Sequence, residues 1–341
     1  MDRYRECLEE LRQNTRQWTL TGAAGFIGSN ILQTLLELDQ KVVALDNFAT
    51  GHRHNLEAVQ EKVGPTRWEG LRFVEGDIRD GQVCQDVCRD SDFVLHQAAL
   101  GSVPRSVDHP LESHEVNITG FLNMLIAARD QKCRNFVYAA SSSTYGDEMS
   151  LPKVEDKIGN PLSPYAVTKY ANELYAQVFN TNYGLDTIGL RYFNVFGPRQ
   201  DPRGAYAAVI PLWVMSFLEN KPIYINGDGE TSRDFCFIGN VVRANIMSAL
   251  ASEQGRNQVY NIAVGEQTTL NQLYHMIGEG LGRRGKGRAG AKPVYRDFRD
   301  GDVRHSLADI SKAKRLLGYE AVTRVGDGLE QSLDWYVENL R

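Results

Sequence analysis

Thr21-Gly22-Ala23-Ala24-Gly25-Phe26-Ile27-Gly28 is the stretch that decides the fold of this chain. A short apolar run, Trp18–Thr21, precedes the glycines, and apolar residues recur with helical spacing over Phe26–Leu38. A glycine-rich turn between a buried strand and a helix is typical of sheets that bind dinucleotides. The spacing GxxGxxG differs from the common GxGxxG, so the flanking strand and helix carry this prediction more than the glycines do.

Each glycine of this turn has a separate physical reason. Gly22 permits the tight turn, Gly25 lets a pyrophosphate approach the backbone, and Gly28 lets the helix pack closely on the strand. The first N–H groups of the helix have no partner within the helix, and the helix dipole adds partial positive charge there. We therefore expect a pyrophosphate at the start of the helix.

The same alternation of strands and helices continues along the chain. We expect further strands at Lys41–Leu45, Phe73–Glu75, Phe93–His96, Asn135–Ala140 and Thr187–Leu190, and helices at Leu111–Gln131 and Pro164–Tyr183. Strands rich in Val, Leu and Phe with intervening helices indicate a parallel sheet that is covered on both faces. The predicted fold is therefore α/β, with a doubly wound parallel Rossmann sheet.

This regular pattern ends near residue 190, and aromatic residues, prolines and glycines then become frequent. We predict a dinucleotide-binding domain over residues 1–190, with a short amphipathic helix over residues 1–16 on its outside. Residues 191–341 are expected to form a smaller, less regular α/β lobe. Part of the chain near 234–264 is expected to return to the first domain.

Composition excludes several classes of protein. The 341 residues are 42% hydrophobic and 24% charged, which is ordinary for a globular protein. A net charge of −5 argues against a nucleic-acid partner. No apolar run approaches the ~18 residues of a membrane span, and residues 1–17 do not read as a signal peptide. The five cysteines form no CxxC and the seven histidines no metal-ligand pattern, so we expect reduced thiols, a cytoplasmic location and no metal.

Two carboxylates follow predicted strands and point to the type of cofactor. Asp46 ends the second strand, where a carboxylate binds ribose hydroxyls and repels a 2′-phosphate, so NAD is favoured over NADP. Asp77, in the stretch EGDIRD, is placed to meet the adenine edge, but an Asp that caps a helix would look the same in the sequence.

A tyrosine and a lysine indicate acid–base chemistry. Tyr165 and Lys169 are four residues apart in a predicted helix that starts at Ser163-Pro164, so both lie on one face. The pKa of a free tyrosine is about 10, and we expect the adjacent ammonium to lower it enough for a general base. Hydroxyl groups follow the strand Asn135–Ala140, at the edge where parallel sheets bind ligands; they belong to Ser141, Ser142 and Ser143.

Six motifs in order resemble the extended short-chain dehydrogenase/reductases. They read TGAAGFIG (21–28), LDNFATG (45–51), HQAA (96–99), SSSTYGD (141–147), YAVTK (165–169) and RYFNVFGPRQ (191–200). The subgroup that they resemble most is the UDP-hexose 4-epimerases, especially bacterial UDP-N-acetylglucosamine 4-epimerases. The resemblance extends from about Trp18 to Trp335.

The resemblance implies a reaction and a set of cofactor-binding residues. Tyr165 would be the base at the sugar 4-hydroxyl, Ser141 would relay the proton, and Ser143 would face the sugar. Hydride would pass from C4 to tightly bound NAD and return to the other face of a 4-keto sugar. The implied cofactor-binding residues are Gly22, Gly25, Phe26, Ile27, Gly28, Asp46, Asn47, Gly51, Asp77, Ile78, Gln97, Ala98, Ala99, Asn117, Tyr165, Lys169 and Tyr192.

The resemblance also assigns the second lobe to a UDP-sugar. Arg233 and Arg299 would face the diphosphate, for which guanidinium groups are suited. Ser306 would occupy a position that gates the sugar pocket, and its small size implies UDP-GlcNAc and UDP-GalNAc as substrates. The implied substrate-binding residues are Gly101, Ser102, Val103, Asn194, Gln200, Ala208, Val209, Trp213, Tyr224, Asn226, Arg233, Arg299, Asp302 and Ser306.

Three other functions share much of this pattern. An epimerase of the corresponding uronic acids would share nearly every motif, so it remains an alternative. A dehydratase or decarboxylase of this fold carries extra acids before the position of Tyr145, where this chain has Ser-Ser-Thr. A non-catalytic NAD-binding regulator is disfavoured because Tyr165, Lys169 and the serines are all present. Family members pair the helices near 111–131 and 164–183 into a four-helix bundle, so a homodimer is expected.

Overall fold

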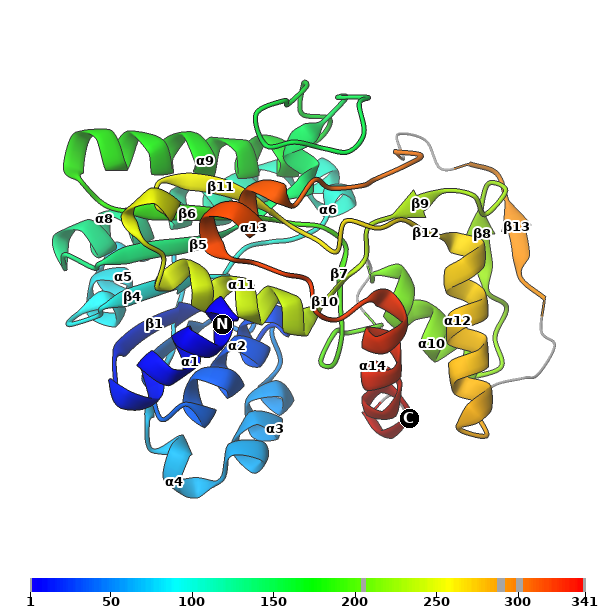
Figure 1. Cartoon of the computed structure of the whole chain (residues 1–341), viewed down its shortest axis with the longest axis horizontal. Coiled ribbons are helices and arrows are strands. Elements are labelled where there is room, and N and C mark those ends of the chain that lie inside the picture. Colours follow the sequence, from blue (N-terminus) through cyan, green and yellow to red (C-terminus); the bar gives the residue numbers. More distant parts are fainter. Residues whose placement is uncertain (1, 204–206, 287–291, 299–302, 340–341) are drawn as a thin grey trace.

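The computed structural model describes residues 2–203, 207–286, 292–298 and 303–339. Its centre is a seven-stranded parallel sheet in the order β11-β6-β5-β4-β1-β2-β3 (Figure 1), which confirms the predicted doubly wound sheet. The strands are β1 (Gln17–Thr21), β2 (Lys41–Asp46), β3 (Leu71–Glu75), β4 (Phe93–His96), β5 (Asn135–Ser141), β6 (Thr187–Tyr192) and β11 (Gln258–Ile262). The strand order reverses between β1 and β4, and ligands of such sheets bind beyond the carboxyl ends at this point.

Helices cover both faces of the sheet, as the buried strands require. One face carries α5 (Gly81–Cys88), α8 (Phe121–Asp130) and α9 (Pro164–Tyr183). The other face carries α2 (Phe26–Glu37) and α11 (Ile238–Ala249), with α1 (Arg3–Gln13) packed on α11. The short helices α3 (Arg53–Val63) and α4 (Pro65–Trp68) lie beside α2.

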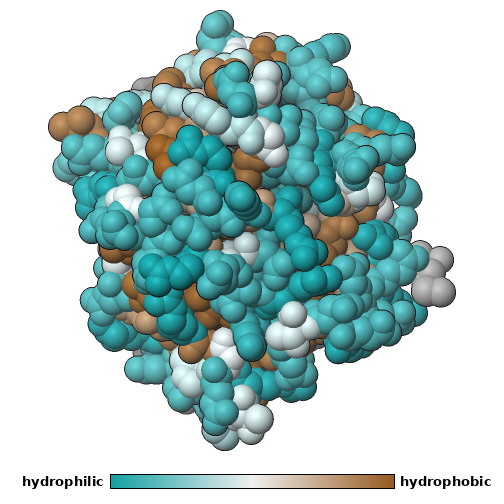
Figure 2. Space-filling model, turned by 90° about the vertical axis from the view of Figure 1, so that its left-hand side faces the viewer, coloured by the Kyte–Doolittle hydropathy of each residue, from teal (hydrophilic) through white to brown (hydrophobic). Residues whose placement is uncertain are grey.

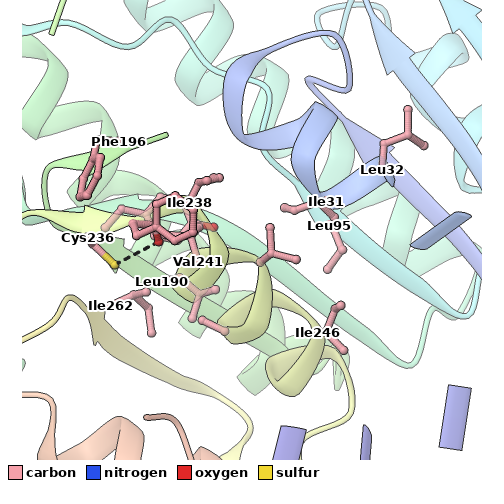
Figure 3. Close-up of a cluster of buried hydrophobic side chains, with 14 of the residues drawn as sticks. Ile31, Leu32, Leu95, Leu190, Phe196, Cys236, Ile238, Val241, Ile246 and Ile262 are labelled. Atoms are coloured by element: carbon pink, nitrogen blue, oxygen red, sulfur yellow. Dashed lines mark hydrogen bonds between the residues drawn. The ribbon is translucent and has the colours of Figure 1, made fainter. Parts of the chain in front are cut away.

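Helix α11 lies at the centre of the larger apolar core. Figure 3 shows its side chains Val241 and Ile246 among residues of the sheet and of α2. Ile238 and Val241 are almost completely buried, and Leu190 of β6 and Ile262 of β11 are fully buried. Because α11 follows β10 in the chain, the second half of the sequence supplies part of the core of the first half.

The start and end of α9 follow from its sequence. Ser163 is the N-cap and its Oγ accepts the N–H of Ala166 at 3.1 Å, and Pro164 occupies the first helical position. Gly184 ends the helix with φ 70°, a left-handed conformation that suits glycine. The helix therefore spans the range predicted from the sequence.

The helix predicted over Leu111–Gln131 is instead three segments. They are α7 (Pro110–His114), a π-helical turn over Glu115–Gly120, and α8. Within the wide turn, Asn117 directs its amide to the backbone of Leu100. Gly120 meets Ile78 so closely that a Cβ would lie 2.6 Å from that side chain. Neither contact could be read from the apolar spacing.

The carboxyl-terminal half combines short strand pairs with helices. The pairs join β7 (Val195–Phe196) with β10 (Cys236–Phe237), β8 (Tyr224–Asn226) with β13 (Val294–Arg296), and β9 (Ser232–Arg233) with β12 (Thr268–Thr269). The helices α10 (Val209–Leu218), α12 (Leu270–Arg283) and α14 (Val325–Asn339) contact one another, and α13 (Ser311–Leu317) lies against β11. From β10 the chain passes through α11 and rejoins the sheet as β11, beside β6.

The surface is mostly polar on the face shown in Figure 2, where apolar side chains form small patches among hydrophilic ones. In the part of the chain that the structure describes, no helix combines the length and apolar character needed to cross a membrane.

Candidate active site

A cavity of about 470 Å³ lies at the carboxyl edge of the sheet, where β1 and β4 diverge. Its walls come from the glycine turn after β1 and from the residues that follow β2, β3 and β4. Twelve of the residues predicted to bind the cofactor line it, namely Gly22, Gly25, Phe26, Ile27, Gly28, Asp46, Asn47, Asp77, Ile78, Gln97, Ala98 and Ala99. Four predicted substrate residues line it as well, namely Gly101, Ser102, Gln200 and Ala208.

Gly22 and Gly28 of the glycine turn have no room for a side chain. A Cβ on Gly28 would lie 2.0 Å from the carbonyl oxygen of Gly22, and Gly22 has φ +70°. Gly25, the N-cap of α2, leaves the first N–H groups without a side-chain cap, and the first turn contains no acidic residue. The helix start therefore meets the cavity with partial positive charge, which fits a bound pyrophosphate.

Asp46 is fixed against the glycine turn. Its Oδ2 accepts the N–H of Ala24 at 2.9 Å, and its Oδ1 accepts the N–H of Phe48 at 2.8 Å. Burial raises the pKa of Asp46, and these N–H groups oppose that rise. The carboxylate is held at the edge of the cavity, where it could accept hydrogen bonds from a ribose.

Asp77 does not cap a helix, so one of its two possible roles is excluded. Asp80 is the N-cap of α5, and its side chain accepts the N–H groups of Gln82 and Val83. Asp77 instead binds Arg79 and Asn47, and the Arg79 hydrogen bond is the largest influence that lowers its pKa, to about 2.

Three predicted cofactor residues lie behind the cavity lining. Asn117 is 2% exposed and holds both backbone polar groups of Leu100. The Tyr192 hydroxyl donates to Gln97 at 3.0 Å and accepts a hydrogen bond from the Asn245 amide. A Cβ on Gly51 would lie 2.8 Å from the backbone of Ala24. These residues support the segments that form the cavity wall.

Tyr165 and Lys169 lie close together on α9. The Lys169 Nζ is 5.9 Å from the centroid of the Tyr165 ring and donates to the carbonyl oxygen of Ala139 at 2.7 Å. Burial lowers the pKa of Lys169 to about 8 and raises the pKa of Tyr165. The prediction that the ammonium lowers the Tyr165 pKa is wrong for this structure, because burial outweighs the other influences.

The serines at the end of β5 leave one hydroxyl proton free to be donated to Tyr165. The Ser141 Oγ accepts two hydrogen bonds, from the Ser143 N–H at 3.1 Å and from the Ser143 hydroxyl at 2.9 Å. Two accepted bonds occupy both lone pairs of a hydroxyl oxygen, so the Ser141 proton is available as a donor. A hydrogen bond between Ser141 and Tyr165 lowers the pKa of the phenol and partly offsets its burial. Ser142 starts the short 3₁₀ turn Ser142–Tyr145.

A second cavity, of about 360 Å³, adjoins the first. Gln200, Ala207 and Ala208 line both cavities. Six further residues of the predicted substrate set line the second cavity, namely Asn194, Val209, Trp213, Tyr224, Asn226 and Arg233. The Arg233 guanidinium donates to the carbonyl oxygens of Ser232 and Arg304.

Four predicted substrate residues are not among those that line these two cavities. Ser306 lies beside Ser232, whose carbonyl accepts the Ser306 N–H at 3.1 Å. Val103 is 43% exposed at the start of α6 (Val103–Asp108). Arg299 and Asp302 lie outside the described residues.

Sequence reasoning missed Arg199 as a cavity residue. Arg199 is 8% exposed, lines the cofactor cavity, and binds the side chains of Asn30 and Gln33 on α2. Its position in the motif RYFNVFGPRQ was the available signal. Within the described ranges, no group of three or more His, Cys, Asp or Glu residues could hold a metal ion.

Comparison with known proteins gives one consistent family. Residues 18–263 match the NAD dependent epimerase/dehydratase family. A UDP-glucose 4-epimerase of Mycolicibacterium smegmatis is 32% identical over 319 residues, which cover 93% of this chain and 97% of that protein.

Two solved structures extend the comparison to three dimensions. A UDP-N-acetylglucosamine 4-epimerase from Methanobrevibacter ruminantium, in complex with UDP-N-acetylmuramic acid, is 36% identical with a TM-score of 0.87, and 95% of this chain and 99% of that chain are covered. A variant UDP-glucuronic acid 4-epimerase from Bacillus cereus, in complex with NAD and UDP-4-deoxy-4-fluoro-glucuronic acid, is 31% identical with a TM-score of 0.83, and coverage is 94% and 99%.

The glycine turn and Asp46 fit NAD, and the neighbouring cavity contains an arginine beside aromatic and amide side chains. The chain therefore belongs to the NAD-dependent epimerase/dehydratase family, and within it to the UDP-sugar 4-epimerases.

Proposed function

We propose that this enzyme interconverts UDP-GlcNAc and UDP-GalNAc by inverting carbon 4 of the sugar. The observation that carries the choice of sugar is the small side chain of Ser306, next to Ser232 and Arg233. A bulky residue at this position would leave less room for a 2-N-acetyl group. The Methanobrevibacter ruminantium protein, which is named for the same activity, supports the proposal.

Tyr165 and Ser141 supply the acid–base chemistry in this proposal. Tyr165 accepts the proton of the sugar 4-hydroxyl in one direction and returns it in the other. Ser141 donates a hydrogen bond to the Tyr165 oxygen, which stabilises the phenolate as it forms. NAD, held by the glycine turn and Asp46, would supply the hydride acceptor and donor for carbon 4. Lys169, held by the Ala139 carbonyl, adds positive charge beside the Tyr165 ring.

Arg233 is the residue that we assign to the diphosphate. Among the described residues of the substrate cavity, it is the one that carries a charge at neutral pH. Tyr224 and Asn226 alternate with buried Ile225 along β8, so both face the cavity and could contact the nucleotide. We also assign Arg299 and Asp302 to the nucleotide, from the resemblance alone.

A uronate epimerase is the second candidate. A sugar carboxylate would need a cation in addition to the arginine that binds the diphosphate. Arg105 lines the cofactor cavity in the same wall as Gly101 and Ser102, so a basic residue is present there. The Bacillus cereus structure shows that a uronate epimerase has a closely similar fold.

One experiment separates these functions. The purified protein is incubated with UDP-GlcNAc, UDP-Glc and UDP-GlcNAc uronate without added NAD, and the products are separated by chromatography. We expect UDP-GalNAc from UDP-GlcNAc without added cofactor, because NAD is regenerated in each cycle and stays bound. A large preference for the uronate would overturn the proposed substrate, and a strict need for added NAD would overturn the proposal of tightly bound NAD.

We further propose that the enzyme is a homodimer joined through a four-helix bundle. The outer face of α9 exposes Val167, Leu174 and Val178, which are 47–51% exposed, and Leu111 on α7 is 69% exposed. Two copies that pair these helices would cover this apolar surface. Light scattering that shows only a 38.3 kDa species would refute the dimer.

We also retain the proposal of a cytoplasmic protein. All five cysteines are free and buried, so none is placed for a disulfide on the surface. Fractionation of the source cells with an antibody against the chain tests this location.

A further inference from the structure

The first turn of α9 obtains its hydrogen bonds from two serines on different parts of the chain. Pro164 has no N–H, and Ser163 satisfies the N–H groups of Ala166 and Val167 through its side chain and its carbonyl. The N–H of Tyr165 donates instead to the Oγ of Ser106, at 3.0 Å and 59 residues earlier. The backbone of the proposed catalytic tyrosine is therefore capped by another helix.

Ser106 is held in one orientation. It is 1% exposed, and its hydroxyl donates to the carbonyl oxygen of Val103 at 2.7 Å. Because the only proton of the hydroxyl is used there, a lone pair remains for the N–H of Tyr165. The N-cap of helix α6 is Ser102, which lines the cofactor cavity and has φ 116°, a conformation that residues with a side chain rarely adopt.

The carbonyl of Tyr165 is anchored as well. The Thr168 hydroxyl donates to it at 2.8 Å and accepts a hydrogen bond from the Asn117 amide at 3.2 Å. The same amide group of Asn117 also binds both backbone polar atoms of Leu100. Two side-chain connections thus join the backbone of Tyr165 to the segment Leu100–Val103, which borders the cavity.

We propose that Ser106 is a positioning residue for the epimerase reaction, because it fixes the Tyr165 backbone relative to Ser141 and to the cavity wall. The proposal rests on the proposed role of Tyr165. Without the Ser106 Oγ, the first N–H of α9 loses its acceptor and the helix start can shift. A displacement of about 1 Å in a reacting group can reduce the rate by about 100-fold.

The chain offers a matched control. Ser113 on α7 is also 1% exposed, but its Oγ has no hydrogen-bond partner. Ser106→Ala and Ser113→Ala therefore remove the same atom from equally buried positions of neighbouring helices. We expect kcat to fall about tenfold or more for Ser106→Ala, with KM for the UDP-sugar changed less than about twofold. Ser113→Ala should keep both constants near those of the wild type.

Further variants separate positioning from a loss of structure. Ser106→Thr keeps the hydroxyl and should recover most of the lost kcat. Ser106→Cys keeps nearly the same volume with a weak acceptor, and it should resemble Ser106→Ala; it also replaces Ser106→Ala in the test if that variant does not fold. Equal kcat for the Ser106 and Ser113 variants, or a Thr variant that folds but is as slow as the Ala variant, would overturn the positioning role.

Tyr165→Phe distinguishes this proposal from the proposed function. If Tyr165→Phe retains the wild-type rate, the role of Tyr165 is wrong, and the role of Ser106 falls with it. If Tyr165→Phe is inactive while Ser106→Ala matches Ser113→Ala, the acid–base role stands and only the positioning role is refuted.

Discussion

The two cavities of this enzyme are built in different ways. The cofactor cavity lies beyond the carboxyl ends of four adjacent parallel strands, so the sheet positions much of its lining. The second cavity, to which we assign the UDP-sugar, is lined by residues of α10, of strands of two or three residues and of the loops between them. A cavity of the second kind can change its residues without changing the sheet. This difference agrees with relatives of one fold that are named for UDP-glucose, UDP-N-acetylglucosamine and UDP-glucuronate.

The interactions that hold the two regions differ in the same way. Around the cofactor, the close approach of Gly22 and Gly28 is a contact of backbone with backbone. In the substrate half, Asp234 is fully buried and its carboxylate accepts the N–H groups of Val264, Gly265 and Ala308. One side chain thus joins three segments that no extended sheet holds together.

The largest expected effect belongs to the region beside the cofactor. Tyr165→Phe should lower kcat by about 100- to 10,000-fold, because general acid–base catalysis contributes that much. NAD content and UDP-sugar affinity should stay near the wild type, because Tyr165→Phe keeps the ring and removes only the hydroxyl group that carries the proton. Epimerisation rates measured beside the cofactor absorbance check both expectations. Loss of NAD together with activity would show that the hydroxyl serves binding rather than proton transfer.

The next prediction concerns a buried ion pair between β6 and α9. Arg191 of β6 binds Glu173 of α9 through two hydrogen bonds of 2.7 and 2.9 Å, and both side chains are at most 7% exposed. Glu173→Gln leaves a buried guanidinium without its counter-charge and should lower the free energy of unfolding by about 3–5 kcal/mol. Urea denaturation measures this change.

An exposed ion pair provides the control for this experiment. Glu75 binds Arg53 at 2.6 Å, and both side chains are more than half exposed. Glu75→Gln should change the unfolding free energy by less than about 1 kcal/mol. Similar effects of the two substitutions would contradict the view that burial fixes the position of α9.

The next prediction concerns the pH dependence of the free energy of unfolding. His96 in one region and Asp234 in the other should change it in opposite directions. Burial lowers the pKa of His96, behind the cofactor cavity, to about 3, with Lys169 as a second cause. The unfolded chain therefore binds a proton at His96 that the folded chain does not bind. The free energy of unfolding then falls as the pH decreases from about 6.5 toward 3. Between pH 6.5 and pH 5 we expect His96 to lower the free energy of unfolding by about 2 kcal/mol.

The His96→Gln variant isolates this contribution, because the difference between its pH dependence and that of the wild type measures His96 alone. Asp234 should act in the opposite direction. Burial raises its pKa to about 6, so the folded state binds the proton more tightly and gains stability as pH falls from 6 toward 3.8. A stability difference between wild type and His96→Gln that does not change with pH would contradict the neutral, buried state of His96.

The last prediction concerns the substrate region. Ser306→Tyr should lower kcat/KM for UDP-GlcNAc by about 10- to 100-fold, as expected for about 1–3 kcal/mol of overpacking. The value for UDP-Glc and the NAD content should stay unchanged. Full activity of this variant on acetylated sugars would remove the main support for the proposed substrate.

Sequence reasoning predicted the features that depend on neighbouring residues in the chain. The strands β2, β4 and β5 contain continuous apolar runs, and the helix cap at Ser163-Pro164 and the stop at Gly184 are local signals. These features depend on neighbours in the sequence, so the sheet and the start of α9 were predictable. The spacing of Tyr165 and Lys169 was predictable for the same reason.

Contacts between distant residues could not be read from the sequence. Ser106 is an ordinary serine in the stretch GSVPRS until α9 is placed beside it, and the π-helical turn at Asn117 depends on the position of Leu100. The direction of the Tyr165 pKa shift depends on burial, and spacing along a helix does not reveal burial. The resemblance to known epimerases named substrate residues that no local pattern distinguishes.

The path of the chain through the sheet limits how this enzyme can be divided. The chain leaves the sheet at Tyr192 and rejoins it at Gln258, and α11 covers the apolar face just before that return. Residue 262 must therefore be synthesised before the sheet can be completed. The cofactor half cannot finish folding as a separate amino-terminal unit. A graft that exchanges the substrate region between relatives needs three junctions, because that region comprises one segment before α11 and another after β11. A simple truncation would leave β6 as an open edge.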